Sequence, residues 1–194
     1  FPGKYNMENA SAALCVSDLL KIKKDVAIRG LEKTPTPNGR FNIICTGPTI
    51  VIDFAHTPNS LRSLLETVRN KLTHNEIITV VFGCAGERDT EKRAPMGKIA
   101  SELADRIVIT AEDPRTEDVN EIMNDIESGF TTKTINYKKI PDRYEAIQYA
   151  INSASKNEWV LITGKGHEQS MCYGTKEKPW SDTEAVESIL NKFE

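Results

Sequence analysis

The chain has 194 residues, of which 39% are hydrophobic and 27% are charged, and its formal net charge is −3. This composition predicts a soluble globular protein, and the length suffices for one sizeable core with a smaller appendage. The slightly acidic balance gives no reason to expect a nucleic-acid or anionic-membrane partner. No apolar run approaches the ~20 residues that span a bilayer, and no signal-peptide pattern opens the chain.

The first part of the chain has a helical pattern and ends in a linker rich in Pro and Gly. Asn9–Lys23 is rich in Ala and Leu, Asp25–Glu32 predicts a second short helix, and Thr34–Gly39 breaks the pattern. We therefore expect a domain boundary near residue 38. Residues 1–37 would be the end of one domain plus the linker, and residues 38–194 would be a second domain.

Beyond the linker, strand-like runs alternate with amphipathic helical stretches, in which apolar residues recur three and four apart. This alternation predicts an α/β fold: a Rossmann-like, mostly parallel sheet with helices on both faces, preceded by the short helical segment. The expected strands are Phe41–Cys45, Ile50–Asp53, Ile77–Phe82, Arg106–Thr110, Thr134–Tyr137 and Trp159–Thr163. The expected helices are Thr57–Leu72, Glu91–Ala104, Asn120–Gly129, Asp142–Ser153 and Thr183–Phe193.

The four cysteines (Cys15, Cys45, Cys84 and Cys172) are scattered, with neither CxxC spacing nor nearby histidine pairs. Disulfide and zinc interpretations are therefore weak, and we expect reduced thiols, a cytoplasmic location and no metal site in this chain. The first residue is Phe1 rather than Met, which suggests a fragment of a longer polypeptide.

The expected strand Trp159–Thr163 runs directly into the sequence Gly-Lys-Gly-His-Glu. Gly164 and Gly166 remove side-chain bulk where the strand ends, so the backbone can bend sharply and its N–H groups can approach a ligand. Lys165 and Glu168 add a cation and a carboxylate. Because ligands of open α/β sheets bind at the carboxyl ends of the strands, this segment is a candidate binding loop. A structural turn with solvated charges is the alternative.

Asp53 stands at the end of another expected strand, a frequent place for a carboxylate that binds a ribose hydroxyl. His56 and Thr57 follow at the entry to a helix, where unpaired N–H groups favour phosphate. An ordinary helix start explains these residues equally well, with Thr57 as the N-cap, Pro58 as the first helical residue and His56 solvated.

Two more strand ends carry charged residues beside Gly or Pro. Gly83 and Gly86 form a flexible turn before Arg88, whose guanidinium suits a planar anion, although an ion pair with a neighbouring acid is the alternative. In the next loop, Arg115 suits a carboxylate, and Glu112 or Asp113 suits an ammonium. We therefore expect one binding site for a small zwitterion at this edge of the sheet.

These residues together resemble the carboxy-terminal part of the Mur ligases, most closely the branch that makes UDP-N-acetylmuramoyl-tripeptide. The matching stretches occur in family order and span nearly the whole chain. They are Gly3-Lys-Tyr-Asn-Met-Glu-Asn-Ala10, Gly39-Arg-Phe41, Asp53-Phe-Ala-His-Thr-Pro58, Phe82-Gly-Cys-Ala-Gly-Glu-Arg-Asp89, Asp113-Pro-Arg115 and Gly164-Lys-Gly-His-Glu168.

The resemblance implies an ATP-dependent ligase of peptidoglycan synthesis that joins an amino acid to a UDP-N-acetylmuramoyl-peptide through an acyl phosphate. Residues 1–37 would then be the end of the central, ATP-binding domain, and residues 38–194 the whole third domain. The phosphate-binding loop, the Mg ligands and a modified lysine of the family would lie outside this chain. ATP and Mg are thus the implied cofactors, no catalytic residue is expected here, and the chain alone would be inactive.

The resemblance also assigns two sets of binding residues. Those expected at the nucleotide are Asn9, which resembles the adenine contact, together with Arg40, Asp53 and His56. Those expected at the incoming amino acid are Arg88, Asp113, Arg115, Gly164 and Glu168. The hinge after Pro37 would permit closure, which excludes water from an acyl phosphate.

Two residues depart from the family pattern. Diaminopimelate-adding members usually have Asn where this chain has Asp113, yet Arg115 is retained, whereas lysine-adding members commonly lack it. Asp113 would either pair with Arg115 and weaken its grip or hold an ammonium. Asn42 replaces a Glu often found after the Gly-Arg pair. We therefore expect a diamino or basic amino acid as substrate, without choosing one.

Two alternatives stay open. One is another ligase of the same superfamily, of the folylpolyglutamate- or cyanophycin-synthetase type. The other is a non-catalytic module that binds an amino acid or a nucleotide, which the absence of GxxxxGK[ST] allows. A dehydrogenase is disfavoured because no dinucleotide fingerprint follows the first strand. The acceptor peptide and the oligomeric state are left open.

Overall fold

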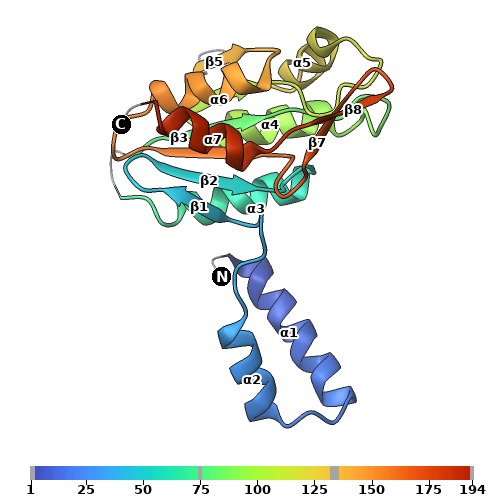
Figure 1. Cartoon of the computed structure of the whole chain (residues 1–194), viewed down its shortest axis with the longest axis vertical. Helices are drawn as coiled ribbons and strands as arrows, with labels where there is room; N and C mark the ends of the chain where they lie inside the picture. The colour runs from blue at the N-terminus through green and yellow to red at the C-terminus, as the bar shows by residue number, and fades with distance from the viewer. Residues whose placement is uncertain (1–2, 74–75, 132–135, 193–194) are drawn as a thin grey trace.

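The computed structural model describes residues 3–73, 76–131 and 136–192, which form a helical hairpin and an α/β unit (Figure 1). The hairpin consists of α1 (Lys4–Leu19) and α2 (Lys24–Lys33). It projects from the α/β unit, to which residues 34–41 join it without forming a helix or strand. Within these ranges no helix is long and apolar enough to cross a membrane.

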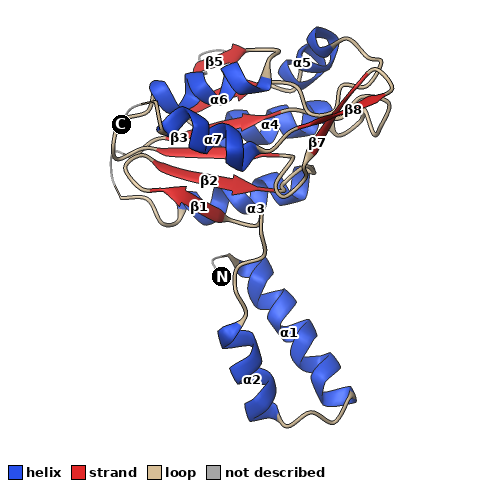
Figure 2. Ribbon diagram, viewed as in Figure 1, coloured by secondary structure: helices blue, strands red, loops and turns tan. Residues whose placement is uncertain are grey.

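A sheet forms the centre of the α/β unit (Figure 2). It has six strands in the order β1-β2-β6-β3-β4-β5. The first strand pairs antiparallel with its neighbour, and the other pairings are parallel. The predicted mostly parallel sheet is therefore confirmed. The strands are β1 (Asn42–Cys45), β2 (Thr49–Asp53), β3 (Ile78–Phe82), β4 (Arg106–Ile109), β5 (Asn136–Lys139) and β6 (Trp159–Thr163).

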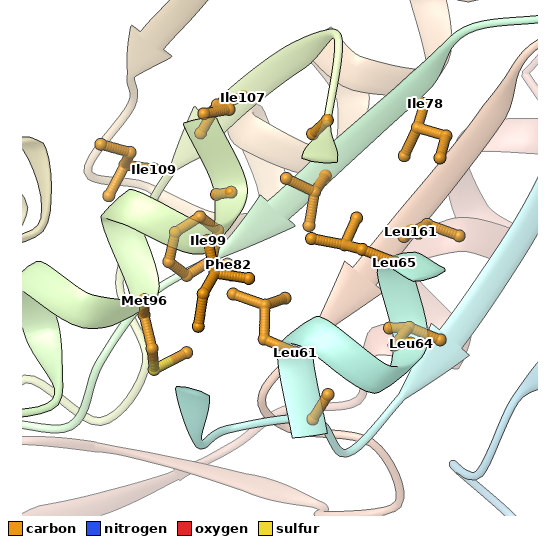
Figure 3. Packing of buried hydrophobic residues seen from close by; sticks show 14 of the residues in the cluster. Leu61, Leu64, Leu65, Ile78, Phe82, Met96, Ile99, Ile107, Ile109 and Leu161 are labelled. Carbon is orange, nitrogen blue, oxygen red and sulfur yellow. The ribbon is translucent and has the colours of Figure 1, made fainter. Parts of the chain in front are cut away.

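Helices cover both faces of the sheet, as predicted, and each face has its own core. Along β3, Val80 and Phe82 belong to the first core and Val81 to the second, because successive side chains of a strand point to opposite faces. Figure 3 shows part of the first core, where Leu61 and Leu65 pack near Phe82. The first core lies against α3 (Pro58–Arg69), α4 (Arg93–Leu103) and α5 (Val119–Glu127), and the second against α6 (Arg143–Asn152) and α7 (Asp182–Leu190).

The start of α3 illustrates how local sequence determines these elements. Thr57 and Ser60 form a capping box, and Pro58 occupies the first helical position, where it loses no hydrogen bond. The helix start predicted at Thr57 and Pro58 is therefore confirmed, whereas His56 is half-buried against Phe54 rather than solvated. It directs the apolar face of α3 onto the sheet.

Differences from the predicted elements concern boundaries and one hairpin. The α1 helix begins at Lys4, five residues before the predicted Asn9. Thr134 and Phe193, the outer ends of a predicted strand and a predicted helix, lie outside the described residues. The hairpin of β7 (Ser170–Tyr173) and β8 (Lys176–Pro179) was not predicted, because β8 is polar, has four exposed residues and ends in Pro.

Candidate functional site

The loops that follow β2, β3, β4 and β6 meet at a cleft of about 550 Å³ at the carboxyl edge of the sheet. The topology explains this convergence, since these four strands are parallel and neighbours in the sheet. Six of the predicted site residues line the cleft: His56, Arg88, Asp113, Arg115, Gly164 and Glu168.

Hydrogen bonds join the loop after β3 to the loop after β4. Gly86 donates its N–H to the carbonyl of Asp113 (2.9 Å), and Arg115 Nη1 donates to the carbonyl of Gly86 (2.7 Å). A Cβ on Gly86 would lie 2.0 Å from the carbonyl oxygen of Pro114, so only glycine permits this approach. The two loops therefore hold one wall of the cleft in a fixed arrangement.

Arg88 is exposed and lines the cleft, while its neighbour Glu87 accepts a hydrogen bond from Thr116 in the adjacent loop. Across residues 3–73, 76–131 and 136–192, Arg88 forms no ion pair with Glu87 or Asp89. Its guanidinium thus remains available to an anion. Arg115 uses one terminal nitrogen on Gly86 and has a φ of 52°, a backbone conformation uncommon for a residue with a side chain.

The Lys165 ammonium lies between two carboxylates of the cleft. Its Nζ is 2.8 Å from Asp113 Oδ1 and 2.6 Å from Glu168 Oε2, and the residue is 1% exposed. Asp113 Oδ1 also accepts the backbone N–H of Cys172 at 2.9 Å. Of the two partners expected for Asp113, the structure therefore selects an ammonium, but that ammonium is the protein's own Lys165 rather than a ligand's.

Glu112 is a buried carboxyl group that also lines the cleft, and its Oε2 has no hydrogen-bond partner among the described residues. Burial raises its pKa to about 8, against the attraction of Lys92, Arg143 and Lys165. Gly164, with a φ of 104°, leaves the space for it, because a Cβ there would lie 2.3 Å from Glu112 Oε2. Glu112 thus presents an unused acceptor at the cleft.

Arg143 supports the floor of this edge from within the protein. It pairs with Asp182 through Nε and Nη2, both at 2.8 Å. It also donates to the carbonyls of Ala111 (3.1 Å) and Thr163 (2.8 Å), the residues that lead into the loops after β4 and β6. Because both loops are hydrogen-bonded to this one buried guanidinium, Arg143 fixes their relative positions.

Asp53 does not line the cleft. Its two carboxylate oxygens accept the backbone N–H groups of Phe41 (2.7 Å) and Ala55 (2.8 Å), and it is 7% exposed. Burial raises its pKa, while these hydrogen bonds and the nearby Arg40 oppose the rise. In this structure Asp53 ties the start of β1 to the loop after β2. Its predicted ribose contact stays a prediction.

Of the other predicted nucleotide residues, Arg40 and His56 pack against the ring of Phe54. Arg40 lies over the Phe54 ring at 4.6 Å, and the rings of His56 and His167 are 4.5 and 5.3 Å from it. Arg40 also lines a second cleft of about 440 Å³, at the junction with the hairpin, together with Asn9. Asn9 and Arg40 are thus brought together, whereas His56 faces the first cleft.

Sequence reasoning named Lys165 as a cation and Glu112 as a possible ammonium partner, but it missed that both side chains are buried, and it missed Arg143 altogether. The spacing of Lys165 and Glu168 hints at an ion pair, but Asp113 lies 52 residues away from Lys165. No group of three or more His, Cys, Asp or Glu side chains that could hold a metal ion occurs within the described ranges. The four cysteines are free.

Comparisons with known proteins identify the family to which this chain is similar. The family model described as "Mur ligase, glutamate ligase domain" matches residues 39–166. The UDP-N-acetylmuramoyl-L-alanyl-D-glutamate–2,6-diaminopimelate ligase of Clostridioides difficile (strain 630) is 37% identical over 99% of this chain and 40% of its own length. The ligase of the same name from Rickettsia prowazekii (strain Madrid E) is 39% identical over 97% of this chain and 38% of its own.

Solved structures show the same likeness. A structure of a UDP-N-acetylmuramoyl-L-alanyl-D-glutamate–2,6-diaminopimelate ligase superposes with a TM-score of 0.77 and 30% identity, over 100% of this chain and 39% of that one. The UDP-N-acetylmuramate-alanine ligase of Thermotoga maritima, at 23% identity and a TM-score of 0.68 over 100% of this chain and 38% of that one, shares the fold. The chain spans about two fifths of the length of these relatives. With a family model over most of its α/β unit and relatives matched along nearly its whole length, the chain belongs to the Mur ligase family.

Proposed function

We propose that this chain is the amino-acid-binding wall of an ATP-dependent ligase that joins an amino acid to a UDP-N-acetylmuramoyl-peptide. The observation that carries the proposal is the single cleft at the carboxyl edge of the sheet, which is lined by side chains from four separate strand ends. Residues 1–37 would form the carboxy-terminal end of the central domain, and residues 38–194 would form the third domain. The four free cysteines agree with the cytoplasmic location expected for such an enzyme.

The charges of the cleft fit a small zwitterion that carries more than one positive and more than one negative group. Arg88 and Arg115 offer two guanidinium groups for carboxylates, and Glu112 and Glu168 offer acceptors for ammonium groups. Such contacts hold an attacking amine in line with its target, which lowers the entropic part of the barrier.

We propose 2,6-diaminopimelate as that amino acid, because the relatives named above are diaminopimelate ligases. Diaminopimelate carries two carboxylates and two amines, which matches the two guanidinium and two acidic groups. The acidic Asp113 does not oppose this choice, since its charge is balanced by Lys165 at 2.8 Å. Arg115 is therefore left to bind a carboxylate.

The cleft that Asn9 and Arg40 share would receive the nucleotide, since an amide and a guanidinium suit a base and a phosphate or ribose. Asp53 and His56 would contribute from the adjoining loop. Bound ATP supplies the phosphoryl group that activates the acceptor carboxylate. We expect the Mg ligands and the phosphate-binding loop in the remainder of the intact ligase.

The test is amino-acid-dependent release of ADP by the intact protein that carries this chain, with diaminopimelate, lysine and ornithine as separate substrates. Diaminopimelate should support turnover best. Arg115→Ala should raise the KM for the amino acid at least about 30-fold and leave the KM for ATP within about twofold, since a charge-assisted contact is lost at one ligand only.

Arg62→Ala is the matched control, because Arg62 lies on α3 outside the cleft, in an exposed ion pair with Glu102. It should change neither KM. No turnover with any of the three amino acids, or equal effects of Arg115→Ala on both KM values, would overturn the proposal.

A further inference from the structure

Lys165 is a fully buried cation that contacts the candidate cleft only through other side chains. It follows Gly164, and its ammonium bridges Asp113 in the loop after β4 and Glu168 in its own loop. Burial lowers the pKa of Lys165, but the hydrogen bonds and charges of Asp113 and Glu168 raise it above its ordinary value, so the group is an ammonium at neutral pH.

We propose that Lys165 is a positioning residue for the incoming amino acid, which aims Glu168 into the cleft and locks three surrounding segments together. The inference rests on the proposed function, because it assigns Lys165 a task in binding the substrate of that same cleft. The three segments are the loop after β4, the loop after β6 and the hairpin β7–β8.

The locking follows from the contacts of Asp113. A single carboxylate oxygen, Oδ1, accepts both Lys165 Nζ and the backbone N–H of Cys172 in β7. Arg115, two residues further on, is also hydrogen-bonded to the hairpin. It donates its N–H to the carbonyl of Cys172 in β7 (3.1 Å), and its carbonyl accepts the N–H of Gly174 (2.7 Å). Lys165 therefore joins the loop after β6 to a substructure that already includes the hairpin.

The backbone of this substructure is strained and needs such support. Asp113 and Arg115 have φ values of 45° and 52°, in the left-handed region that costs a residue with a side chain about 1 kcal/mol or more. Strained residues persist where the surrounding contacts over-determine them. Without the ammonium, Asp113 would keep a charge with little solvent and could relax away from this geometry, taking Arg115 with it.

The aiming of Glu168 follows from its two oxygens. Glu168 Oε2 is held by Lys165 at 2.6 Å, and the backbone N–H of Glu168 donates to the carbonyl of Lys165 at 3.0 Å, so both the carboxylate and the backbone of Glu168 are held. Its side chain is 40% exposed and lines the cleft, which leaves Oε1 to a ligand. Lys165 also offsets the repulsion between the carboxylates of Asp113 and Glu168.

The experiment compares Lys165→Met, Lys165→Met with Asp113→Asn, and the control Lys176→Met in the intact ligase. Met keeps the length of the side chain without the charge, and the amide introduced by Asp113→Asn can still accept the Cys172 N–H without needing a cation. Lys176 is an exposed lysine of β8 outside the cleft lining. Each variant is measured for the KM of diaminopimelate, the KM of ATP, the thermal midpoint and hydrogen exchange of residues 164–174.

Lys165→Met should raise the KM for diaminopimelate about 10- to 100-fold, because a displaced binding group of this kind costs up to about 10²-fold, and should leave the KM for ATP within about twofold. It should also speed hydrogen exchange in residues 164–174. Lys165→Met should lower the thermal midpoint, because the charge of Asp113 is then uncompensated. The double variant should recover the midpoint, since Asp113→Asn removes that charge. Its KM for diaminopimelate should stay raised at least about tenfold, because Glu168 still lacks its partner. Lys176→Met should match the wild type.

A KM for diaminopimelate within twofold of wild type in Lys165→Met would overturn the inference. So would a double variant in which the KM and the midpoint recover together, because Lys165 would then act only by relieving charge. Failure of the wild type to release ADP with any amino acid would instead defeat the proposed function. In that case unchanged exchange of residues 164–174 in Lys165→Met would overturn the locking role as well.

Discussion

At the carboxyl edge of the sheet, charged groups such as those of Arg143 and Lys165 are fully buried and paired, whereas apolar groups on the α1–α2 hairpin are exposed. Leu19 at the end of α1 is 81% exposed and Leu20 is 67% exposed. The two regions thus invert the usual rule that apolar residues lie inside and charged residues outside. A side chain is buried where long-range partners surround it, not where its own hydrophobicity would place it.

The hairpin has few such partners. Two helices cannot surround an apolar side chain from all directions, and α2 contains no buried residue. The carboxyl edge, in contrast, receives four strand ends and the hairpin β7–β8, which together exclude water from charged groups. The buried charges of Arg143 and Lys165 are tolerated there because both side chains are paired and hydrogen-bonded.

Among the variants that test this contrast, Arg143→Met should lower the free energy of unfolding most. The change leaves Asp182 buried without its cation and removes the donors to the carbonyls of Ala111 and Thr163. We expect the free energy of unfolding to fall by about 3–5 kcal/mol, the usual cost of removing one partner of a buried ion pair. Urea unfolding at neutral pH measures it.

Arg62→Met supplies the matched control for that change. Its ion pair with Glu102 lies at the surface, where the two side chains are 39% and 33% exposed, so its loss should cost less than about 1 kcal/mol. Equal costs for Arg143→Met and Arg62→Met would contradict the view that burial makes the Arg143 pair structurally important.

A smaller effect is expected from Glu112→Gln, and it depends on pH. The pKa of Glu112 is about 8 in the folded protein and 4.5 ordinarily, so the folded state retains a proton that the unfolded chain releases. This contribution to stability is complete below pH 4.5 and is lost as the pH rises towards 8. Gln resembles the protonated form and has no such loss.

The free energy of unfolding of Glu112→Gln, relative to wild type, should therefore rise by on the order of 1–4 kcal/mol between about pH 5 and pH 8, at about 1.4 kcal/mol for each unit of pKa shift. Denaturation series at several pH values measure this difference. Glu187→Gln, on the exposed side of α7, controls for the loss of a negative charge. Parallel curves for wild type and Glu112→Gln would show that Glu112 is charged in the folded state throughout this range.

Local pattern was enough to predict the alternation of strands and helices, because each element carries its own periodicity and caps, as Thr57 and Pro58 do for α3. The convergence of Arg88, Arg115 and Glu168 at one cleft was also predictable, since parallel strands bring their carboxyl ends together. The β7–β8 hairpin was not, because its strands are stabilised by pairing rather than by composition.

Local pattern could not predict which side chains pair at the site, because the pairs join segments that are far apart in the sequence. Asp113 was expected to bind Arg115 or an ammonium, and its actual partners, Lys165 and Cys172, are 52 and 59 residues away. The ribose contact expected of Asp53 stays a prediction, and local pattern also did not reveal that its oxygens accept the N–H groups of Phe41 and Ala55. Only the assembled sheet edge decides which charges meet.

The smallest effect on the free energy of unfolding is expected from Leu19→Ala, which tests the contrast in the α1–α2 hairpin. Because Leu19 is 81% exposed and Ala is at least as favourable as Leu in a helix, we expect the free energy of unfolding to change by no more than about 0.5 kcal/mol. The same substitution at Leu65, fully buried in α3, should cost about 2–5 kcal/mol through lost burial and the cavity left behind. Urea unfolding of both variants measures the difference. A cost above about 1 kcal/mol for Leu19→Ala would mean that the apolar side of α1 is covered in solution, and the contrast between the two regions would then fail.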